Sequence, residues 1–484
     1  MSSKLKEIGG ATLNYGIGKF LPQVIGFFLI PLYTMYLTPE DYGIVELATA
    51  FGAFSLILMR LALPGSVSRF YYEHKEGPEL RDYITTIYWS LLAISVGMAA
   101  LIYIVSYFFL HKLVPGLPLW PFVGVVLLAD IFSANSEIQK RLLQARKQSA
   151  YSAKLSIVTS LVGIITAIVL VVGFDLGALG IVGASLMGST IFFIQAQFYL
   201  RKDMGGNFSF KLLTPSFKYA LNILPSHFVT PFGNLLSRSL LSGFSSLAAV
   251  GLYSLAMRFI TPLYLISEAF NTAFSPIYFE ARKKDEPEGY KKLEDACKKI
   301  WLVAIFMFVA ASALTPSLIH LITPERYHPA AELIPFMAIS FLPTVLTVMY
   351  SNEMYYSKKT AWVSVIAVTR FVSNLAIALL FIEQWGYYAL ILAKFIENII
   401  IMLFSVFISR KMFNFNPNVP LIIKSGLLGL VLVAVSVLFA NYQPNSYLQL
   451  GFGLALVAAF AGLLVVTRMA SIDTLKNYIK SKRL

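Results

Sequence analysis

Charged side chains stand inside long apolar stretches of this sequence. The basic ones are Lys19, Arg60, Arg238, Arg258, Arg370 and Lys394. The acidic ones are Glu46, Asp130, Glu137, Glu268, Glu353 and Glu397. A cation at the centre of a membrane costs at least ~2.5 kcal/mol, so such residues usually mark a water-filled cavity or a charged partner. The chemistry that this pattern favours is binding of an ion or an ionic substrate.

Several of these residues have candidate partners within the chain. Lys394 and Glu397 are three residues apart, which predicts an ion pair on one helix. Arg370 either faces a cavity or hydrogen-bonds Asn374, one helical turn along. Asp130 has no local partner, so it either pairs with a cation on another helix or titrates as a proton site.

The balance of charge favours an anionic substrate. The chain contains a weak internal repeat, described below, that divides it into two halves. The first two apolar stretches of each half carry five basic residues, namely Lys19, Arg60, Arg238, Arg258 and His227. Against these stand only Glu46 and Glu268, which can meet Lys19 or Arg258. If these stretches face each other across one cavity, the cavity is cationic and suits a phosphate, whose hydration shell Arg and Lys replace. We predict that the substrate is bound by Lys19, Arg60, Arg238, Arg258, Arg370 and His227. Our candidates for ion coupling are Asp130, Glu46 and Glu268.

Structural explanations compete for some of these residues. Arg60 lies near one end of its stretch, where a long side chain can reach the membrane surface. Lys19 can reach the surface in the same way, although Gly16 and Gly18 beside it suggest a segment that faces the interior. Arg238 lies near the other end of its stretch and can be a rim residue.

Composition places the chain in a membrane. Of its 484 residues, 57% are hydrophobic and only 13% are charged, whereas soluble domains carry roughly 25% charged residues. The basic excess, a net charge of +14, lies in short loops, which is the pattern of a membrane protein rather than of a nucleic-acid surface. The single cysteine, Cys297, excludes an internal disulfide and a cysteine-based metal site. We expect no catalytic residues, no metal and no cofactor, and no GxxxxGK[ST] loop for nucleotides is present.

The apolar stretches predict an all-α integral membrane protein with about 14 transmembrane helices. Of the 39 Lys and Arg residues, 31 lie in alternate loops and the tails, which places both termini in the cytoplasm. The predicted spans cover residues 11–37, 42–66, 83–110, 118–140, 152–174, 177–200, 216–241, 247–276, 298–322, 331–354, 360–382, 386–409, 419–441 and 446–468.

A weak internal repeat divides the chain. Shifted by 208 residues, the stretch 11–51 matches its second copy at eight positions, including Gly43 with Gly251. Two further parallels are Ala150-Tyr151 with Ala361-Trp362, at an offset of 211, and Gly177 with Gly386, at 209. Repeats of six spans are parallel and related by an axis along the membrane normal. We predict two pseudo-symmetric six-helix lobes, residues 1–205 and 206–412, and two extra C-terminal helices with a cytoplasmic tail in 413–484.

The turn between the first two predicted spans carries a helix start signal. Thr38 can cap the second helix, Pro39 suits its first position, and Glu40 and Asp41 favour its positive end. This turn, read as FLIPLYTMYL-TPEDYGIVEL, resembles the polysaccharide-biosynthesis (Wzx-type) flippase family of the multidrug/oligosaccharidyl-lipid/polysaccharide (MOP) exporter superfamily. The fourteen spans and the two lobes are similar to that family over the whole chain.

The resemblance implies a function and a location. It implies a flippase in the bacterial inner membrane that translocates undecaprenyl-diphosphate-linked oligosaccharide for O-antigen, capsule or related polysaccharides, by alternating access of the two lobes. It implies as partners the lipid-linked oligosaccharide, membrane lipids and, as a further candidate, the polysaccharide polymerase machinery. The diphosphate would contact cavity cations, for which we expect Lys19 with Arg258.

Three alternatives stay open beside this reading. A flippase for a lipid-linked peptidoglycan precursor would share the fourteen spans and the cationic cavity. A drug exporter of the same superfamily would typically have twelve spans and a cavity suited to cations. A membrane glycan polymerase or ligase would need a large external loop, whereas the external loops here are short.

Overall fold

The computed structural model describes residues 14, 16, 18, 21–74, 77–284, 286–359, 361–413, 417–443, 445–467 and 469, and its regular structure there is helical throughout. Among these residues, twelve helices are long and apolar enough to cross a membrane. The predicted all-α membrane fold is therefore confirmed. The predicted span at 216–241 falls in a helix of 35 residues that is too polar to be counted among the twelve. The predicted span at 11–37 lies partly outside the described residues, and Lys19 is among those outside them.

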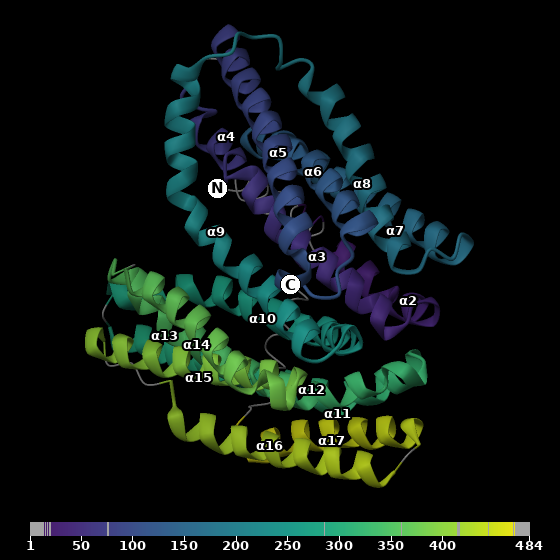
Figure 1. Ribbon diagram of the computed structural model, residues 1–484. Helices are drawn as coiled ribbons and strands as arrows, with labels where there is room; N and C mark the ends of the chain where they lie inside the picture. Colours follow the sequence, from purple (N-terminus) through teal and green to yellow (C-terminus); the bar gives the residue numbers. More distant parts are fainter. Residues whose placement is uncertain are drawn as a thin grey trace. The chain divides into compact units, whose positions relative to one another are not determined.

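The chain divides into two compact units, Met1–Gly251 and Leu252–Leu484. Unit 1 contains α2 (Ile30–Tyr36), α3 (Pro39–Arg60), α4 (Pro64–Phe70), α5 (Pro78–Leu113), η1 (Leu119–Val123), α6 (Gly124–Ala145), α7 (Ser149–Ile168), η2 (Val169–Gly173), α8 (Gly177–Leu200) and α9 (Phe210–Phe244). The first turn of α10 (Leu247–Lys284) also belongs to unit 1, and the rest of α10 belongs to unit 2. Unit 2 continues with α11 (Pro287–Ile322), η3 (Glu325–Tyr327), α12 (Pro329–Ile339), α13 (Phe341–Tyr356), α14 (Ala361–Trp385), α15 (Tyr387–Met412), α16 (Val419–Tyr442) and α17 (Ser446–Val466) (Figure 1).

Helix α6 is central to unit 1, because it packs against α3, α5 and α8. Helix α9 covers α3, α4 and α5, which is why it belongs to this unit. Phe54 of α3 meets Phe228 and Phe232 of α9 at ring distances of 5.4 and 5.6 Å. The hydroxyl of Tyr83 on α5 lies 3.3 Å from the hydroxyl of Ser216, near the start of α9. The predicted lobe boundary at 205/206 rests on the repeat and stays a prediction.

Unit 2 is built around α15 and α11. Helix α15 packs against α13 and α14, and α11 packs against α12, α16 and α17 (Figure 1). Trp301 of α11 donates a hydrogen bond of 2.9 Å to Ser425 of α16. A Cβ on Gly453 of α17 would lie 2.6 Å from the carbonyl oxygen of Ala313, so only glycine allows this approach to α11. The two C-terminal helices are thus fixed to unit 2 by close packing.

Two predicted spans are broken by proline. The span predicted at 42–66 ends at Arg60, because Leu61 and Ala62 adopt left-handed angles (φ 43° and 57°) and Pro64 opens α4. The span predicted at 331–354 divides into α12 and α13 around Ser340. Pro343 explains this second break, since its ring lacks an N–H and clashes with the carbonyl four residues earlier.

The end of α6 and the end of α13 confirm the internal repeat in backbone geometry. At the end of α6, Arg146 N–H donates to Leu142 O, Lys147 to Gln144 O and Gln148 to Leu143 O. At an offset of 211, Ser357 N–H donates to Glu353 O, Lys358 to Tyr355 O and Lys359 to Met354 O. The central lysines, Lys147 and Lys358, have the same left-handed angle (φ 56° and 57°). Gly177 and Gly386, paired from sequence, share φ 51°.

The starts of α3 and α10 repeat each other in the same way. The hydroxyl of Thr38 accepts from Asp41 N–H at 3.1 Å, and the hydroxyl of Ser246 accepts from Ala249 N–H at 3.1 Å. Thr38 N–H also donates to the Asp41 carboxylate at 3.1 Å, so the predicted capping box is confirmed. The second copy has alanine at the place of Asp41 and keeps only the hydroxyl half of the cap.

The two helix starts also touch each other reciprocally. A Cβ on Gly43 would lie 2.1 Å from the carbonyl oxygen of Leu247, and a Cβ on Gly251 would lie 2.0 Å from that of Pro39. Leu247 and Pro39 are themselves related by the 208-residue offset, so each copy meets the other through the same surface. Such an exchange of contacts is the mark of a two-fold arrangement. The repeated glycines therefore make a backbone crossing within unit 1.

We expect Gly43→Ala and Gly251→Ala each to lower stability by about 1–3 kcal/mol, since the added methyl overlaps a carbonyl and the helices must shift. Thermal unfolding of the purified protein in detergent measures the effect. Gly97→Ala is the matched control, because a Cβ on Gly97 in α5 meets nothing within 4 Å. Melting temperatures of Gly43→Ala and Gly251→Ala equal to that of Gly97→Ala would contradict the crossing.

Candidate functional site

Helix α3 carries polar residues that face its two neighbours, α6 and α9. Glu46, Ser55 and Arg60 lie along this helix, and Glu46 and Ser55 are buried. The capping box fixes where α3 begins and hence which side of it faces α6. The facing helix presents Asp130, Ser133 and Glu137 of α6. The site in unit 1 is built from these residues of α3 and α6 together with α9.

Glu46 forms an ion pair with Arg238 of α9. The two side chains meet at 3.2 Å, and they are 7% and 19% exposed respectively. Arg238 also donates to the carbonyl of Asn234, one turn earlier, at 3.5 Å. From sequence, Glu46 was expected to meet Lys19 or Arg258. The structure gives Glu46 a partner on α9, and its expected contact with Lys19 or Arg258 stays a prediction.

Asp130 of α6 is held by a hydroxyl rather than by a cation. Ser55 donates to its carboxylate at 2.5 Å, and Asp130 is only 8% exposed. Gly52 permits this contact, since a Cβ there would lie 2.9 Å from Val126 of α6. In the described part of the chain, the structure records no ion pair for Asp130. A buried carboxylate with one hydroxyl donor is a group that can take up a proton, and the role of Asp130 as a proton site stays a prediction.

Arg60 turns toward α6 at the end of α3. It donates to the carbonyl of Ser133 at 3.0 Å and lies 3.8 Å from Glu137. Glu137 also contacts Arg141 at 3.0 Å and Lys140 at 3.9 Å. One carboxylate is thus surrounded by three cations, and this cluster keeps a positive charge.

Unit 2 contains a second charge cluster, centred on Glu397 of α15. Lys394 lies 3.0 Å from Glu397, so the predicted ion pair is confirmed. Arg370 of α14 reaches the same carboxylate at 3.5 Å, and Asn374 donates to it at 2.8 Å. Arg370 and Asn374 therefore share Glu397, which is 2% exposed, while Arg370 stays 39% exposed. A half-exposed guanidinium beside a buried carboxylate can also bind a second anion.

Sequence reasoning missed a third cluster, at Glu353 of α13. Glu353 is fully buried and accepts from Arg282 at 2.9 Å, from Tyr278 at 2.7 Å and from Ser357 at 2.5 Å. Arg282 lies in the last turn of α10. The available signal was the spacing of Tyr278 and Arg282, which places both on one face of that helix.

The remaining predicted residues differ in their exposure, and one of them lies outside the described residues. His227 on α9 and Glu268 on α10 are exposed, and Arg258 on α10 is half-buried. Lys19 falls outside the described residues. Their roles in binding and coupling stay predictions.

A family model for a polysaccharide biosynthesis protein matches residues 11–282, which is more than half of the chain. The chain belongs to this family. The predicted resemblance is thereby confirmed at the level of the family. No curated protein sequence gives a match to the chain.

Solved transporter structures share the fold of this polysaccharide biosynthesis protein. A lipid II flippase MurJ in an inward closed conformation superposes with a TM-score of 0.72 at 17% identity, covering 94% of this chain and 99% of that one. An inward-facing multidrug resistance MATE family transporter of the MOP superfamily gives 0.64 at 13% identity, with 83% and 97% covered. A MOP superfamily transporter from Pyrococcus furiosus gives 0.51 at 15% identity, with 84% and 95% covered. This polysaccharide biosynthesis protein is therefore a multi-pass membrane protein with the fold of MOP transporters.

The ion pair of Glu46 and Arg238 is expected to stabilise unit 1. Glu46→Gln and Arg238→Gln should each cost about 2 kcal/mol, because each removes one charge of a buried ion pair. The double variant should be at least about 1 kcal/mol more stable than the sum of the single effects predicts. Unfolding in detergent of all four proteins gives this coupling.

Glu288 and Lys292 provide the matched control for this cycle. They form an ion pair of 2.8 Å on the surface of α11, with side chains 75% and 69% exposed. Their coupling should stay below about 0.5 kcal/mol. If the Glu46–Arg238 coupling is as small as this one, the pair does not hold α3 to α9.

Proposed function

We propose that this protein is a flippase of the bacterial inner membrane that translocates undecaprenyl-diphosphate-linked oligosaccharide. The observation that carries the proposal is membership of the polysaccharide biosynthesis family over residues 11–282, joined to the fold of MOP transporters. The glycan product would be O-antigen, capsule or a related polysaccharide. Both termini would lie in the cytoplasm, as the distribution of Lys and Arg favours.

The diphosphate would bind to cations of the membrane-spanning helices. We propose Lys19 with Arg258 as its first contacts. The other proposed contacts are Arg60, Arg238, Arg370 and His227. The clusters described above support an exchange mechanism, since Arg60, Arg238 and Arg370 already lie beside carboxylates. An entering phosphate would replace part of this internal pairing, so that a cation is never left without a counter-charge in the membrane.

Ion coupling is proposed for Asp130, Glu46 and Glu268. The support is strongest for Asp130, whose carboxylate is buried against Ser55 at 2.5 Å. A proton on Asp130 would remove a buried negative charge, and its release would restore that charge beside Ser55. Such a change of charge between α3 and α6 gives a proton gradient a means of biasing the transport cycle.

A flippase for a lipid-linked peptidoglycan precursor is the second candidate function. The similarity to a lipid II flippase over 94% of this chain favours it, although at 17% identity this likeness concerns the fold. A drug exporter is less favoured, because the TM-score to an inward-facing MATE transporter is 0.64, against 0.72 to the lipid II flippase. Family and fold are those of transporters, so we do not propose an enzyme such as a glycan polymerase or ligase. The polymerase machinery is instead a proposed partner.

We predict that Arg258→Ala lowers flipping of lipid-diphosphate oligosaccharide in proteoliposomes at least about tenfold, because a charge-assisted contact with the diphosphate is lost. The assay follows labelled lipid that becomes accessible to an externally added glycan-cleaving reagent. Arg69→Ala is the control, since Arg69 forms an exposed pair with Glu73 on α4. Full transport by Arg258→Ala would remove this residue from the mechanism.

A further inference from the structure

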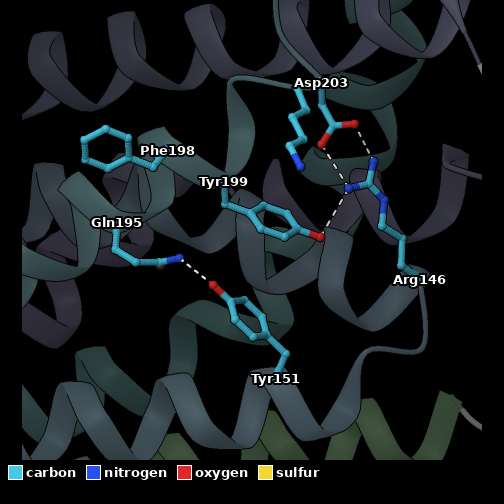
Figure 2. A pocket seen from close by; sticks show the side chains of 7 residues that line it. Arg146, Tyr151, Gln195, Phe198, Tyr199 and Asp203 are labelled. Carbon is cyan, nitrogen blue, oxygen red and sulfur yellow. Dashed lines mark hydrogen bonds and ion pairs between the residues drawn. The ribbon is translucent and has the colours of Figure 1, made fainter.

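A pocket of about 290 Å³ lies where α6 ends, α7 begins and α8 ends. Its lining comes from the Lys- and Arg-rich ends of these three helices, and Figure 2 shows the side chains around it. None of the residues proposed for transport or ion coupling lines it. The pocket therefore needs an explanation of its own.

One side of the pocket is a fixed polar frame. Arg146 donates to both oxygens of Asp203, at 2.5 and 2.9 Å, and to the hydroxyl of Tyr199 at 3.2 Å (Figure 2). It also donates to the hydroxyl of Tyr71 at 3.4 Å. The hydrogen bonds with Asp203 raise the pKa of Arg146 above its ordinary value, so the guanidinium stays charged. Arg146 thus engages both carboxylate oxygens of Asp203.

The other side combines aromatic rings with an unused amide atom. Tyr151 stacks on Tyr199, with ring centres 6.0 Å apart and planes 22° apart. Gln195 donates to the hydroxyl of Tyr151 at 3.0 Å, but its own Oε1 is buried and has no hydrogen-bond partner among the described residues. Rotating the amide by 180° would exchange the two atoms and still leave one unused. A ligand hydroxyl would donate to this oxygen, and with the amide rotated a phosphate oxygen would accept from its N–H.

The charge around the pocket is strongly positive. Lys202 lines it and is exposed, and no hydrogen bond or ion pair of Lys202 is recorded within the described residues. Lys147, Lys154 and Arg201 are exposed on the same helix ends. Asp203 is the one acid among the lining residues, and Arg146 already neutralises it. An anion entering here meets Lys202 without having to break an existing pair.

We propose that this pocket binds the head group of an anionic phospholipid that carries free hydroxyls, of the phosphatidylglycerol type. The phosphate lies on Lys202, a head-group hydroxyl or the phosphate meets the Gln195 amide, and the acyl chains run along α8 past Phe198. Phe198 is 64% exposed and lines the pocket, which supplies an apolar contact beside the polar one. This inference does not depend on which substrate is transported.

The location favours a membrane lipid over a soluble phosphate. Basic pockets between the ends of membrane-spanning helices bind lipid head groups, because anionic lipids of the cytoplasmic leaflet are attracted to the Lys and Arg side chains there. Tyrosines at such ends suit the membrane interface, where one side of the ring is apolar and the hydroxyl is wet. A volume of about 290 Å³ suits one head group and is small for an oligosaccharide.

Native mass spectrometry of the full chain in detergent tests the proposal with phosphatidylglycerol and phosphatidylcholine as probes. We expect phosphatidylglycerol to bind at least about fivefold more tightly, because only its head group leaves a net negative charge for Lys202. Lys202→Gln should weaken binding of phosphatidylglycerol by about fivefold, since it removes the charge and keeps a polar side chain. Phosphatidic acid is a third probe, because its head group has no free glycerol hydroxyls. Gln195→Met should reduce the preference for phosphatidylglycerol over phosphatidic acid, because it removes the amide that meets those hydroxyls.

Lys211→Gln is the matched control, because Lys211 is exposed at the start of α9 and does not line the pocket. Equal weakening by Lys202→Gln and Lys211→Gln means diffuse attraction to charge and overturns the pocket. Equal binding of soluble glycerol 3-phosphate overturns a membrane lipid as the occupant. Binding of undecaprenyl phosphate but not of phosphatidylglycerol, with sensitivity to Lys202→Gln, assigns the pocket to the carrier lipid and also overturns the proposal.

Discussion

A charge that leaves water must find a counter-charge or a hydrogen-bond donor, and this constraint organises the helices of both units. Glu46 and Arg238 join α3 to α9, and Glu353 with Arg282 joins α13 to α10. Each pair costs free energy to desolvate, so its attraction acts mainly on geometry and less on net stability. Helices that are otherwise apolar on most sides thereby obtain one defined partner and one defined register.

We propose that the same constraint gives these ion pairs a place in transport. A substrate that carries its own negative charges can enter a membrane protein only where cations can leave their internal partners at little cost. Arg370, half exposed beside the buried Glu397, is the cation that we propose for this role. The cluster of Glu353, by contrast, is closed by three donors and holds the ends of helices together. In this proposal, arginine–carboxylate pairs that bind substrate and pairs that hold helices together consist of the same residue types, and they differ in how exposed the arginine is.

Much of the fold follows from local sequence. Apolar length predicts the spans, and the Thr38 to Asp41 box predicts where α3 begins, because both depend on residues close in the chain. The repeat was also within reach of the sequence, since Gly43 and Gly251 are equivalent positions. Which charges pair could largely not be predicted from the sequence. Glu46 and Arg238 are separated by 192 residues, and they meet because α9 packs on α3. The pair of Lys394 and Glu397, three residues apart, was predictable for the opposite reason.

Flipping of lipid-linked glycan by the purified wild-type protein tests the central claim most directly. Proteoliposomes would contain undecaprenyl-diphosphate oligosaccharide, lipid II or a lipophilic cation, each against protein-free vesicles. The account predicts rapid appearance of the oligosaccharide lipid on the opposite leaflet, slower movement of lipid II and no protein-dependent flux of the cation. Transport of the cation without movement of either lipid would contradict it.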